Sequence, residues 1–182
     1  MFWKKKTEAA DPHPATPPPL PAQATRSEPA ALQQQPLRLG EGHPGKFDHP
    51  KNPLEISLMA LRARQIDVPS FLEELFNSNI FVVPKKEDIV ASDTGFSLGK
   101  NPHLFSITYP EYVALGLYTS PERAKPTSEQ YPEYRFAIEV HAGEFLMSLG
   151  GDFGIVLNPY WDVNIEFSNV VFQRVLTMMR RD

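Results

Sequence analysis

The distribution of proline divides this sequence into two parts and confines the folded domain to one of them. Ten of the 19 prolines lie in residues 1–50, which include the runs Pro17-Pro18-Pro19-Leu20-Pro21 and Gln33-Gln34-Gln35-Pro36. A segment so rich in proline and so poor in apolar side chains buries too little surface to offset the entropy of ordering it. We therefore expect residues 1–50 to be a disordered tail, partly in polyproline II conformation, and residues 51–182 to form one domain.

Charge and composition exclude several classes of function. Residues 51–182 carry 12 basic and 17 acidic residues, in a chain whose net charge is −4. An acidic domain lacks the basic surface that binds phosphate backbones, so we expect no nucleic-acid partner. The absence of cysteine removes disulfides, thiol catalysis and thiolate zinc sites. No long apolar run follows the basic start Met1-Phe2-Trp3-Lys4-Lys5-Lys6, so we expect a cytoplasmic protein without stable membrane insertion.

Hydrophobic periodicity predicts two helices followed by several strands. Asn52-Pro53 supplies an N-cap residue and a proline for a first helix that ends near Arg62–Gln65. A second helix, capped by Asp67 or Ser70, ends before Asn77-Ser78-Asn79, and the two form an αα-hairpin. Apolar runs and alternation predict strands at 80–83, 104–108, 112–118, 136–140, 155–157 and 163–167. The polar segments 85–88 and 91–98 are expected to be a mobile excursion.

Three more helices complete the predicted pattern. A short one starts at Thr119-Ser120-Pro121-Glu122 and is cut off by Pro126, and another follows His141 and ends at Gly150-Gly151. Ser168-Asn169 begins the closing helix. The order of elements predicts an α+β domain: one mixed, mostly antiparallel sheet with the N-terminal αα-hairpin and the C-terminal helix packed on it.

The turn Asn158-Pro159-Tyr160-Trp161-Asp162 joins the last two predicted strands and holds two large aromatic side chains. Asparagine folds its side chain onto the backbone and proline fixes φ, so we expect the turn to be rigid. Rigid aromatic residues are typical anchors of protein interfaces. Two interpretations stay open: Tyr160 and Trp161 cover the core, or they form a contact surface.

Several segments in this order resemble the N-terminal domain of the SseB family, the bacterial "enhanced serine sensitivity" proteins. The segments that carry the resemblance are Asn52-Pro53-Leu54-Glu55, Phe71-Leu72-Glu73-Glu74-Leu75-Phe76-Asn77-Ser78 running into Ile80-Phe81-Val82-Val83-Pro84, Leu117-Tyr118-Thr119-Ser120-Pro121-Glu122, and Gly154-Ile155-Val156-Leu157-Asn158-Pro159. The resemblance covers about residues 52–179. Tyr118 stands where the family commonly has Phe, and Tyr160-Trp161 replace a small residue after Asn-Pro. The resemblance implies an α+β fold in a bacterial cytoplasm and no established catalytic residues.

The candidate reactive residues make a weak case for catalysis. His141, Glu144 and Asp152 could serve a hydrolase if they met in one pocket, but a helix-capping role is the simpler interpretation of His141. The glycines of Gly150-Gly151-Asp152-Phe153-Gly154 follow a predicted helix instead of preceding one, which is the wrong order for a phosphate-binding loop. We expect no metal, no cofactor and no enzymatic activity.

The leading hypothesis is a non-enzymatic protein-interaction domain on a flexible proline-rich tether, whose partner is another protein. Its partner-binding residues would be those of the rigid turn, namely Asn158, Pro159, Tyr160 and Trp161. A second hypothesis is an inhibitor or immunity-type protein, in which the acidic domain covers a basic toxin or secreted effector. The hydrolase based on His141, Glu144 and Asp152 is the third. The proline-rich run 17–21 is interpreted as a spacer, with docking in an aromatic groove as the alternative.

Overall fold

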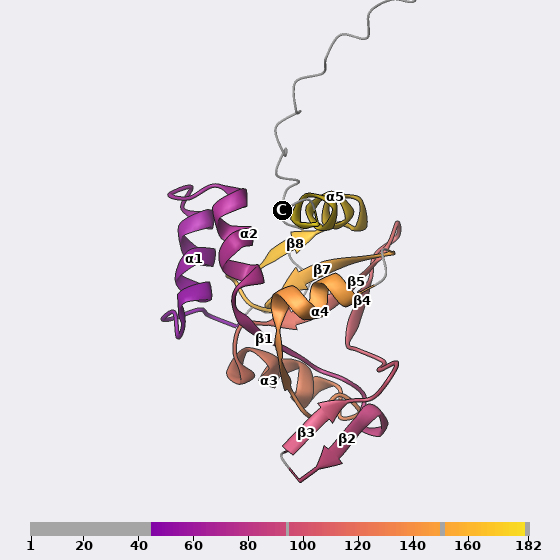
Figure 1. The fold of residues 1–182 in the computed structure, drawn as a ribbon. Helices are drawn as coiled ribbons and strands as arrows, with labels where there is room; N and C mark the ends of the chain where they lie inside the picture. The colour runs from indigo at the N-terminus through magenta and orange to yellow at the C-terminus, as the bar shows by residue number, and fades with distance from the viewer. Residues whose placement is uncertain (1–44, 94, 150–151, 181–182) are drawn as a thin grey trace, which may run out of the picture. The chain divides into compact units, whose positions relative to one another are not determined.

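The computed structural model describes residues 45–93, 95–149 and 152–180 (Figure 1). The chain divides into two units, Met1–Gln35 and Pro36–Asp182, and every described residue belongs to the second. The predicted disorder of residues 1–44 therefore falls outside the described residues. Residues 45–50, which were predicted to belong to the tail, are among the described residues, and Phe47 within them is buried.

The αα-hairpin forms as predicted. Helix α1 (Pro53–Arg62) begins at the N-cap Asn52, whose side chain accepts a hydrogen bond from the Glu55 amide at 2.9 Å. Helix α2 (Val68–Phe76) begins at Asp67, whose side chain accepts from the Ser70 amide at 3.0 Å. Both caps satisfy amides that have no partner inside the helix, and each helix also has a proline in its first turn.

One mixed sheet forms the centre of the domain, as predicted. Its strands are β1 (Asn79–Val82), β4 (Ser106–Thr108), β5 (Val113–Tyr118), β6 (Ile138–His141), β7 (Phe153–Leu157) and β8 (Ile165–Phe167). The strand order is β6-β1-β5-β7-β8, and β4 also pairs with β5. Only β5 and β7 pair in parallel; the other pairs are antiparallel. Strand β7 is buried on both faces, as its apolar run predicts.

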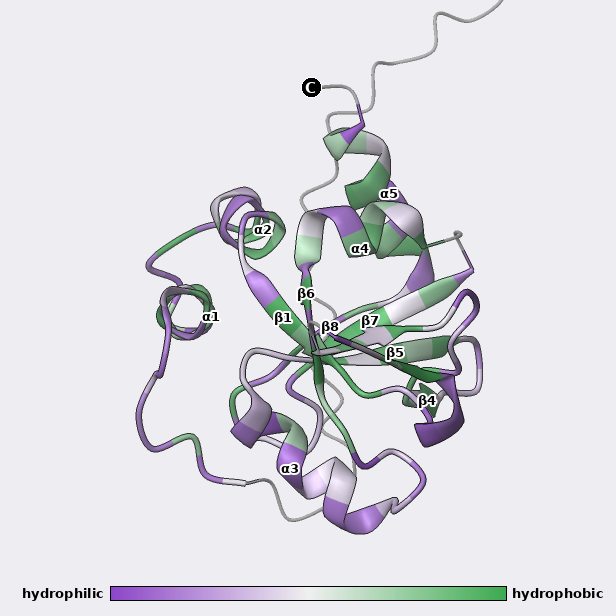
Figure 2. Ribbon diagram, turned by 60° about the horizontal axis from the view of Figure 1, so that its bottom comes forward, coloured by the Kyte–Doolittle hydropathy of each residue, from purple (hydrophilic) through white to green (hydrophobic). Residues whose placement is uncertain are grey.

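Helices cover both faces of this sheet. Figure 2 shows α4 (Ala142–Ser148) and α5 (Asn169–Met179) on one side of it and α3 (Pro121–Gln130) on the other. The αα-hairpin, α4 and α5 enclose the larger apolar core with one face of the strands. A second, smaller core lies beneath α3 and centres on Val83, Phe105, Tyr118 and Ala124. The predicted end of α4 at Gly150-Gly151 lies outside the described residues.

Helix α3 corrects one prediction, because it continues through Pro126 to Gln130. Proline at this position removes one hydrogen bond near the start of the helix, and the following residues continue the ladder. The side chain of Ser120 accepts from the Arg123 amide at 3.4 Å, and Lys125 forms an ion pair with Glu129 one turn later. The helix also buries Arg123, Ala124 and Thr127, and this packing offsets the interruption.

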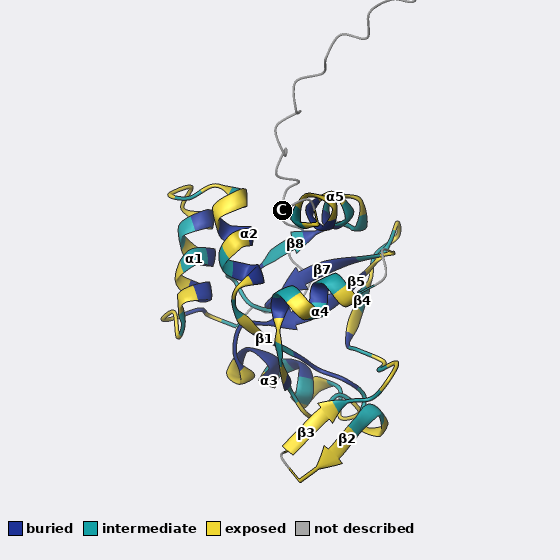
Figure 3. Cartoon of the chain, in the orientation of Figure 1, coloured by how far each residue is buried: buried dark blue, intermediate teal, exposed yellow. Residues whose placement is uncertain are grey.

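The segment predicted as a mobile polar excursion is a second, two-stranded sheet. A 3₁₀ turn at Lys86–Asp88 leads into β2 (Ile89–Ser92), which pairs antiparallel with β3 (Gly95–Leu98). His103 holds the base of this hairpin, because its backbone amide donates to Asp88 Oδ2 at 2.7 Å and its Nδ1 lies 2.9 Å from the same oxygen. Figure 3 shows that this hairpin is largely exposed, and Phe96 is 67% exposed.

Candidate binding site

The turn between β7 and β8 has an unusual backbone. Asn158 has φ = 55° and Tyr160 has φ = 67°, so two non-glycine residues on either side of Pro159 are left-handed. Asparagine tolerates this region, whereas a bulky aromatic residue is rarely found there. The Asn158 amide donates to the Leu117 carbonyl at 2.7 Å, and the Trp161 amide donates to the Asn158 carbonyl at 3.2 Å. The turn is therefore held against the end of β5.

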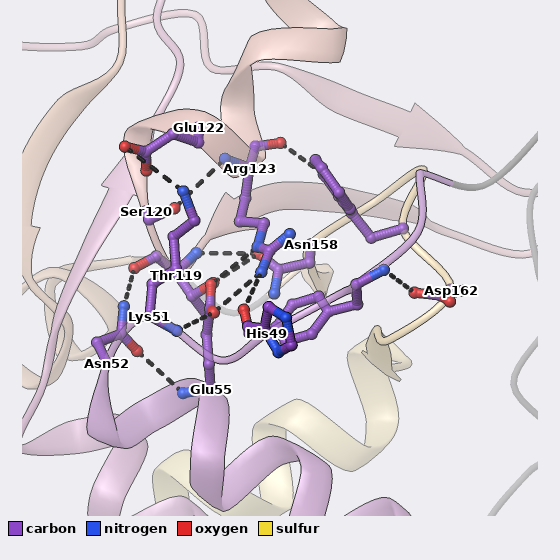
Figure 4. A network of polar contacts seen from close by, with 12 residues as sticks. His49, Lys51, Asn52, Glu55, Thr119, Ser120, Glu122, Arg123, Asn158 and Asp162 are labelled. Carbon is purple, nitrogen blue, oxygen red and sulfur yellow. Dashed lines mark hydrogen bonds and ion pairs between the residues drawn. The ribbon is translucent and has the colours of Figure 1, made fainter.

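A buried side-chain network fixes the conformation of Asn158. Its Oδ1 accepts a hydrogen bond from the Thr119 amide at 2.9 Å and lies 3.1 Å from the Thr119 hydroxyl oxygen. That hydroxyl donates to Glu55 Oε1 at 2.6 Å, which connects the turn to α1 (Figure 4). All three residues are at most 1% exposed. The network therefore links β5, α1 and the β7–β8 turn without contact with solvent.

Glu55 and Arg123 form a buried, two-pronged ion pair at the centre of this network. Arg123 Nε donates to Glu55 Oε1 at 2.9 Å, and the Arg123 Nη2 donates to Glu55 Oε2 at 3.1 Å. The Lys51 amide donates to the same carboxylate at 2.7 Å. Burial alone raises the pKa of Glu55, but the hydrogen bonds from Arg123, Thr119 and Lys51 outweigh it, so the pKa lies below its usual value.

Two aromatic rings enclose the Arg123 guanidinium. Its central carbon lies 3.6 Å from the centroid of the Phe47 ring and 4.4 Å from that of Trp161. The Trp161 indole N–H donates to the Arg123 carbonyl at 2.8 Å. The two rings are perpendicular to each other, with an interplanar angle of 88°. A guanidinium over the faces of two rings gains cation–π attraction while its N–H groups donate to the carboxylate. Trp161 is thus fixed by both the side chain and the backbone of Arg123.

The segment Gly45–Lys51, which we name the strap, crosses over this network. The Gly45 amide donates to the Tyr160 carbonyl at 2.7 Å, and the Phe47 amide donates to Asp162 Oδ1 at 2.8 Å. A Cβ atom added at Gly45 would lie 2.8 Å from the Trp161 ring, so only glycine allows this close approach. The strap belongs to the packed domain, which therefore starts before residue 51.

Aromatic side chains gather on the α3 side of the sheet, around Tyr160. The Phe105 ring lies 5.3 Å from Tyr131, 5.5 Å from Tyr134 and 6.3 Å from Tyr160, measured between centroids. The hydroxyl oxygens of Tyr131 and Tyr160 are 3.4 Å apart. Phe105 is buried and the three tyrosines are half-buried. We name Phe105, Tyr131, Tyr134 and Tyr160 the tyrosine cluster.

Small residues in the sheet make room for these rings. A Cβ atom at Gly116 would lie 2.7 Å from Phe105, and one at Gly154 would lie 2.8 Å from Tyr112. Tyr112 stacks on Tyr109 with ring centroids 4.9 Å apart, and the Tyr112 hydroxyl donates to Glu166. With Tyr118 beneath α3, all six tyrosines of the chain gather on this side of the sheet. Burial raises the pKa of Tyr109, Tyr118 and Tyr160 well above the usual range.

The four residues predicted to bind a partner divide into two pairs. Asn158 and Pro159 are buried and support the turn, whereas Tyr160 and Trp161 are half-buried and pack on residues of the same chain. Binding at this turn stays a prediction. Sequence reasoning missed Glu55, Arg123 and Phe47. One signal was available for Glu55, because it lies three residues before Leu58 on the apolar stripe of α1.

The candidate hydrolase residues do not converge, which contradicts that alternative. His141 ends β6 and its side chain caps α4 through the Glu144 amide at 3.5 Å. Asp152 immediately precedes β7, whose first residue, Phe153, pairs with Val113 at the start of β5. Strand β6 is antiparallel to β1, β1 is antiparallel to β5, and β5 is parallel to β7, so β6 and β7 run in the same direction. His141 is the last residue of β6 and Asp152 precedes the first residue of β7, so the two residues lie at opposite ends of the sheet. Among the described residues, no three His, Asp or Glu side chains are grouped to hold a metal ion.

Within the residues that the structure describes, no helix has the length and apolar character needed to cross a membrane. No curated protein and no solved structure matches the chain. The family model described as "SseB protein N-terminal domain" matches residues 54–170, which include all of α1 except Pro53, the whole central sheet and the β7–β8 turn. The chain therefore belongs to the SseB family.

Proposed function

We propose that this SseB-type domain is a non-enzymatic protein-interaction module of the bacterial cytoplasm, carried on a proline-rich tether. The partner is another protein, and the contact surface consists of the tyrosine cluster together with Trp161. Two features support a binding role in place of a catalytic one. The candidate acid–base residues lie at opposite ends of the sheet, and the titratable groups of the buried network are engaged with each other.

The single observation that carries the proposal is the backbone conformation of Tyr160. A left-handed aromatic residue costs about 1–2 kcal/mol, and such conformations persist where the surrounding structure enforces them, most often at functional sites. Two hydrogen bonds enforce the conformation here: the Thr119 amide donates to Asn158 Oδ1, and the Gly45 amide donates to the Tyr160 carbonyl. Their combined effect is to direct the Tyr160 ring toward Phe105 and Tyr131, where it stays half-exposed.

A rigid arrangement of half-exposed rings favours binding energetically. Ordering a mobile side chain at an interface costs about 0.5–1.5 kcal/mol, and that cost disappears when the ring is already fixed. Tyrosine adds a large apolar area and one hydroxyl for a hydrogen bond, which is why it is enriched among residues that dominate binding energy. The tyrosine cluster supplies three such residues on one surface.

Site-specific crosslinking tests the proposal directly. The full chain is produced in bacteria with the photoreactive residue p-benzoylphenylalanine at position 134, in the tyrosine cluster. The matched control carries it at position 56, which is 58% exposed in the wild type and lies on α1, outside the tyrosine cluster. Irradiation is expected to give a discrete protein adduct from position 134 and none from position 56. Equal crosslinking from both positions, or none from 134, would contradict the proposal.

A further inference from the structure

We propose that the tyrosine cluster binds a proline-rich segment in polyproline II conformation that carries a lysine or arginine next to its prolines. This inference rests on the proposed function and names the chemical class of the partner for the same surface.

The ring arrangement suits this class of ligand. Proline-rich segments dock on surfaces where aromatic rings separate shallow apolar slots, because their pyrrolidine rings fit between aromatic faces. In the cluster, Tyr131 is tilted by 43° to Phe105, whereas Tyr134 meets the same ring edge-on at 83°. The Tyr160 ring is tilted by 53° to the Phe105 ring. Three tyrosines thus surround a buried phenylalanine floor at differing angles, instead of stacking into a flat surface.

The hydroxyl groups supply what such a ligand lacks. A polyproline II segment makes no internal hydrogen bonds, so its backbone carbonyls accept from the protein or from water. Tyr131 and Tyr160 share one hydrogen bond between their hydroxyls, at 3.4 Å, and this bond uses only one of the two protons. The remaining proton can therefore be donated to a ligand carbonyl without breaking a contact of the free protein.

Charge selects a basic ligand. The segments 105–112, 129–135 and 160–166, which supply the half-buried tyrosines of this side, contain five acidic residues and one basic residue, and one of the acidic residues, Glu129, is paired with Lys125. Glu133 is exposed and lies between Tyr131 and Tyr134 in the sequence. A lysine or arginine beside the prolines would meet this negative field, whereas an acidic flank would be repelled.

A peptide titration tests the inference. The probe is Ala-Pro-Pro-Pro-Leu-Pro-Ala-Arg, and the protein is the full chain with Pro17→Ala, Pro18→Ala, Pro19→Ala and Pro21→Ala, since that run belongs to the same ligand class. Affinity is measured by calorimetry, and the binding surface by NMR of ring-labelled tyrosines. We expect shifts at Tyr131, Tyr134 and Tyr160 and none at the fully buried Tyr118. Tyr131→Ala should weaken binding about tenfold or more, and Glu133→Gln should lower its salt dependence.

The controls define the results that overturn the inference. Phe96→Ser removes a more exposed ring on the β2–β3 hairpin and should leave the affinity unchanged. A peptide with alanine in place of the prolines should not bind. The inference is wrong if the proline-rich probe shifts none of the three tyrosines, or if the alanine peptide binds equally well. If position 134 crosslinks in cells to a segment without prolines, the proposed function stands and this inference fails; absence of any adduct contradicts the proposed function itself.

Discussion

Trp161 and Arg123 hold each other through two separate contacts. The Trp161 indole N–H donates to the Arg123 carbonyl at 2.8 Å, while the Arg123 guanidinium lies 4.4 Å from the indole centroid. The same guanidinium forms the buried ion pair with Glu55 and stacks on Phe47 of the strap. Arg123 therefore connects α1, the strap, α3 and the β7–β8 turn. The position of the aromatic turn depends on this buried charge.

Breaking the Glu55–Arg123 pair from one side should destabilise the domain strongly. Glu55→Gln leaves a buried guanidinium without its counter-ion, and loss of one partner of a buried pair costs about 3–5 kcal/mol. Denaturant unfolding measures the change. Glu55→Gln combined with Arg123→Met removes both charges and keeps the Arg123 carbonyl for Trp161, so it should recover more than 1 kcal/mol of that loss. Additive effects of the two substitutions would contradict the coupling.

A carboxylate at position 158 should make stability depend on pH. Asn158 Nδ2 has no hydrogen-bond partner among the described residues, so Asn158→Asp gives up no hydrogen bond and keeps the acceptor for the Thr119 amide. The substitution adds a negative charge close to Glu55, because the Thr119 hydroxyl contacts both side chains. We expect the variant to be markedly less stable than the wild type at pH 7 and to regain stability near pH 5, as the new carboxyl takes up a proton. A deficit that is identical at both pH values would refute electrostatic repulsion as its cause.

The strap should contribute to folding although it lies in the part of the sequence predicted to be tail. Phe47→Ala removes a ring that is 7% exposed and stacks on Arg123, so we expect a loss of about 3–5 kcal/mol in unfolding free energy. Lys46→Ala is the matched control, because Lys46 is exposed and neighbours Phe47. If both variants unfold at the wild-type denaturant midpoint, the strap does not stabilise the domain.

Alkaline pH should unfold the domain through its tyrosines. Burial raises the pKa of Tyr118 far above its unfolded value of about 10, so the stability that this group contributes is complete below pH 10 and falls as the pH rises beyond it. The loss should be about 1.4 kcal/mol per pH unit for this fully buried side chain. Absorbance at 295 nm and circular dichroism, followed together, should show tyrosine ionisation coinciding with unfolding. Complete ionisation of a still-folded chain near pH 10 would contradict this.

Much of the fold follows from local patterns in the sequence. Asn52-Pro53 predicts the start of α1 because capping and proline geometry act within one turn, and the run Ile155–Leu157 predicts the buried strand β7. Local rules predicted too short a helix for α3. Pro126 removes one hydrogen bond, but the helix gains packing from its buried face and continues. Local rules also missed the β2–β3 hairpin, whose residues are mostly exposed and lack a clear alternation of burial.

The site was harder to predict because its contacts are distant in sequence. Large aromatic residues in a tight turn identified Tyr160 and Trp161, whereas Glu55 and Arg123 are 68 positions apart and resemble ordinary surface charges of two helices. Phe47 lies among prolines and polar residues, so composition assigned it to the tail. Only tertiary packing reveals that Arg123 is 3% exposed and Glu55 is fully buried.

Replacing Tyr160 by glycine tests the central claim most directly. Glycine adopts the left-handed backbone of position 160 without strain, which stabilises the fold, whereas loss of the ring destabilises it. These opposite effects should keep the unfolding temperature within a few degrees of the wild-type value. Affinity capture by the immobilised full chain is compared with Tyr160→Gly and Phe96→Ser, and bound proteins are quantified by mass spectrometry. The account predicts a partner that is retained by the wild type and Phe96→Ser and reduced at least tenfold by Tyr160→Gly. Undiminished capture by a folded Tyr160→Gly chain would contradict it.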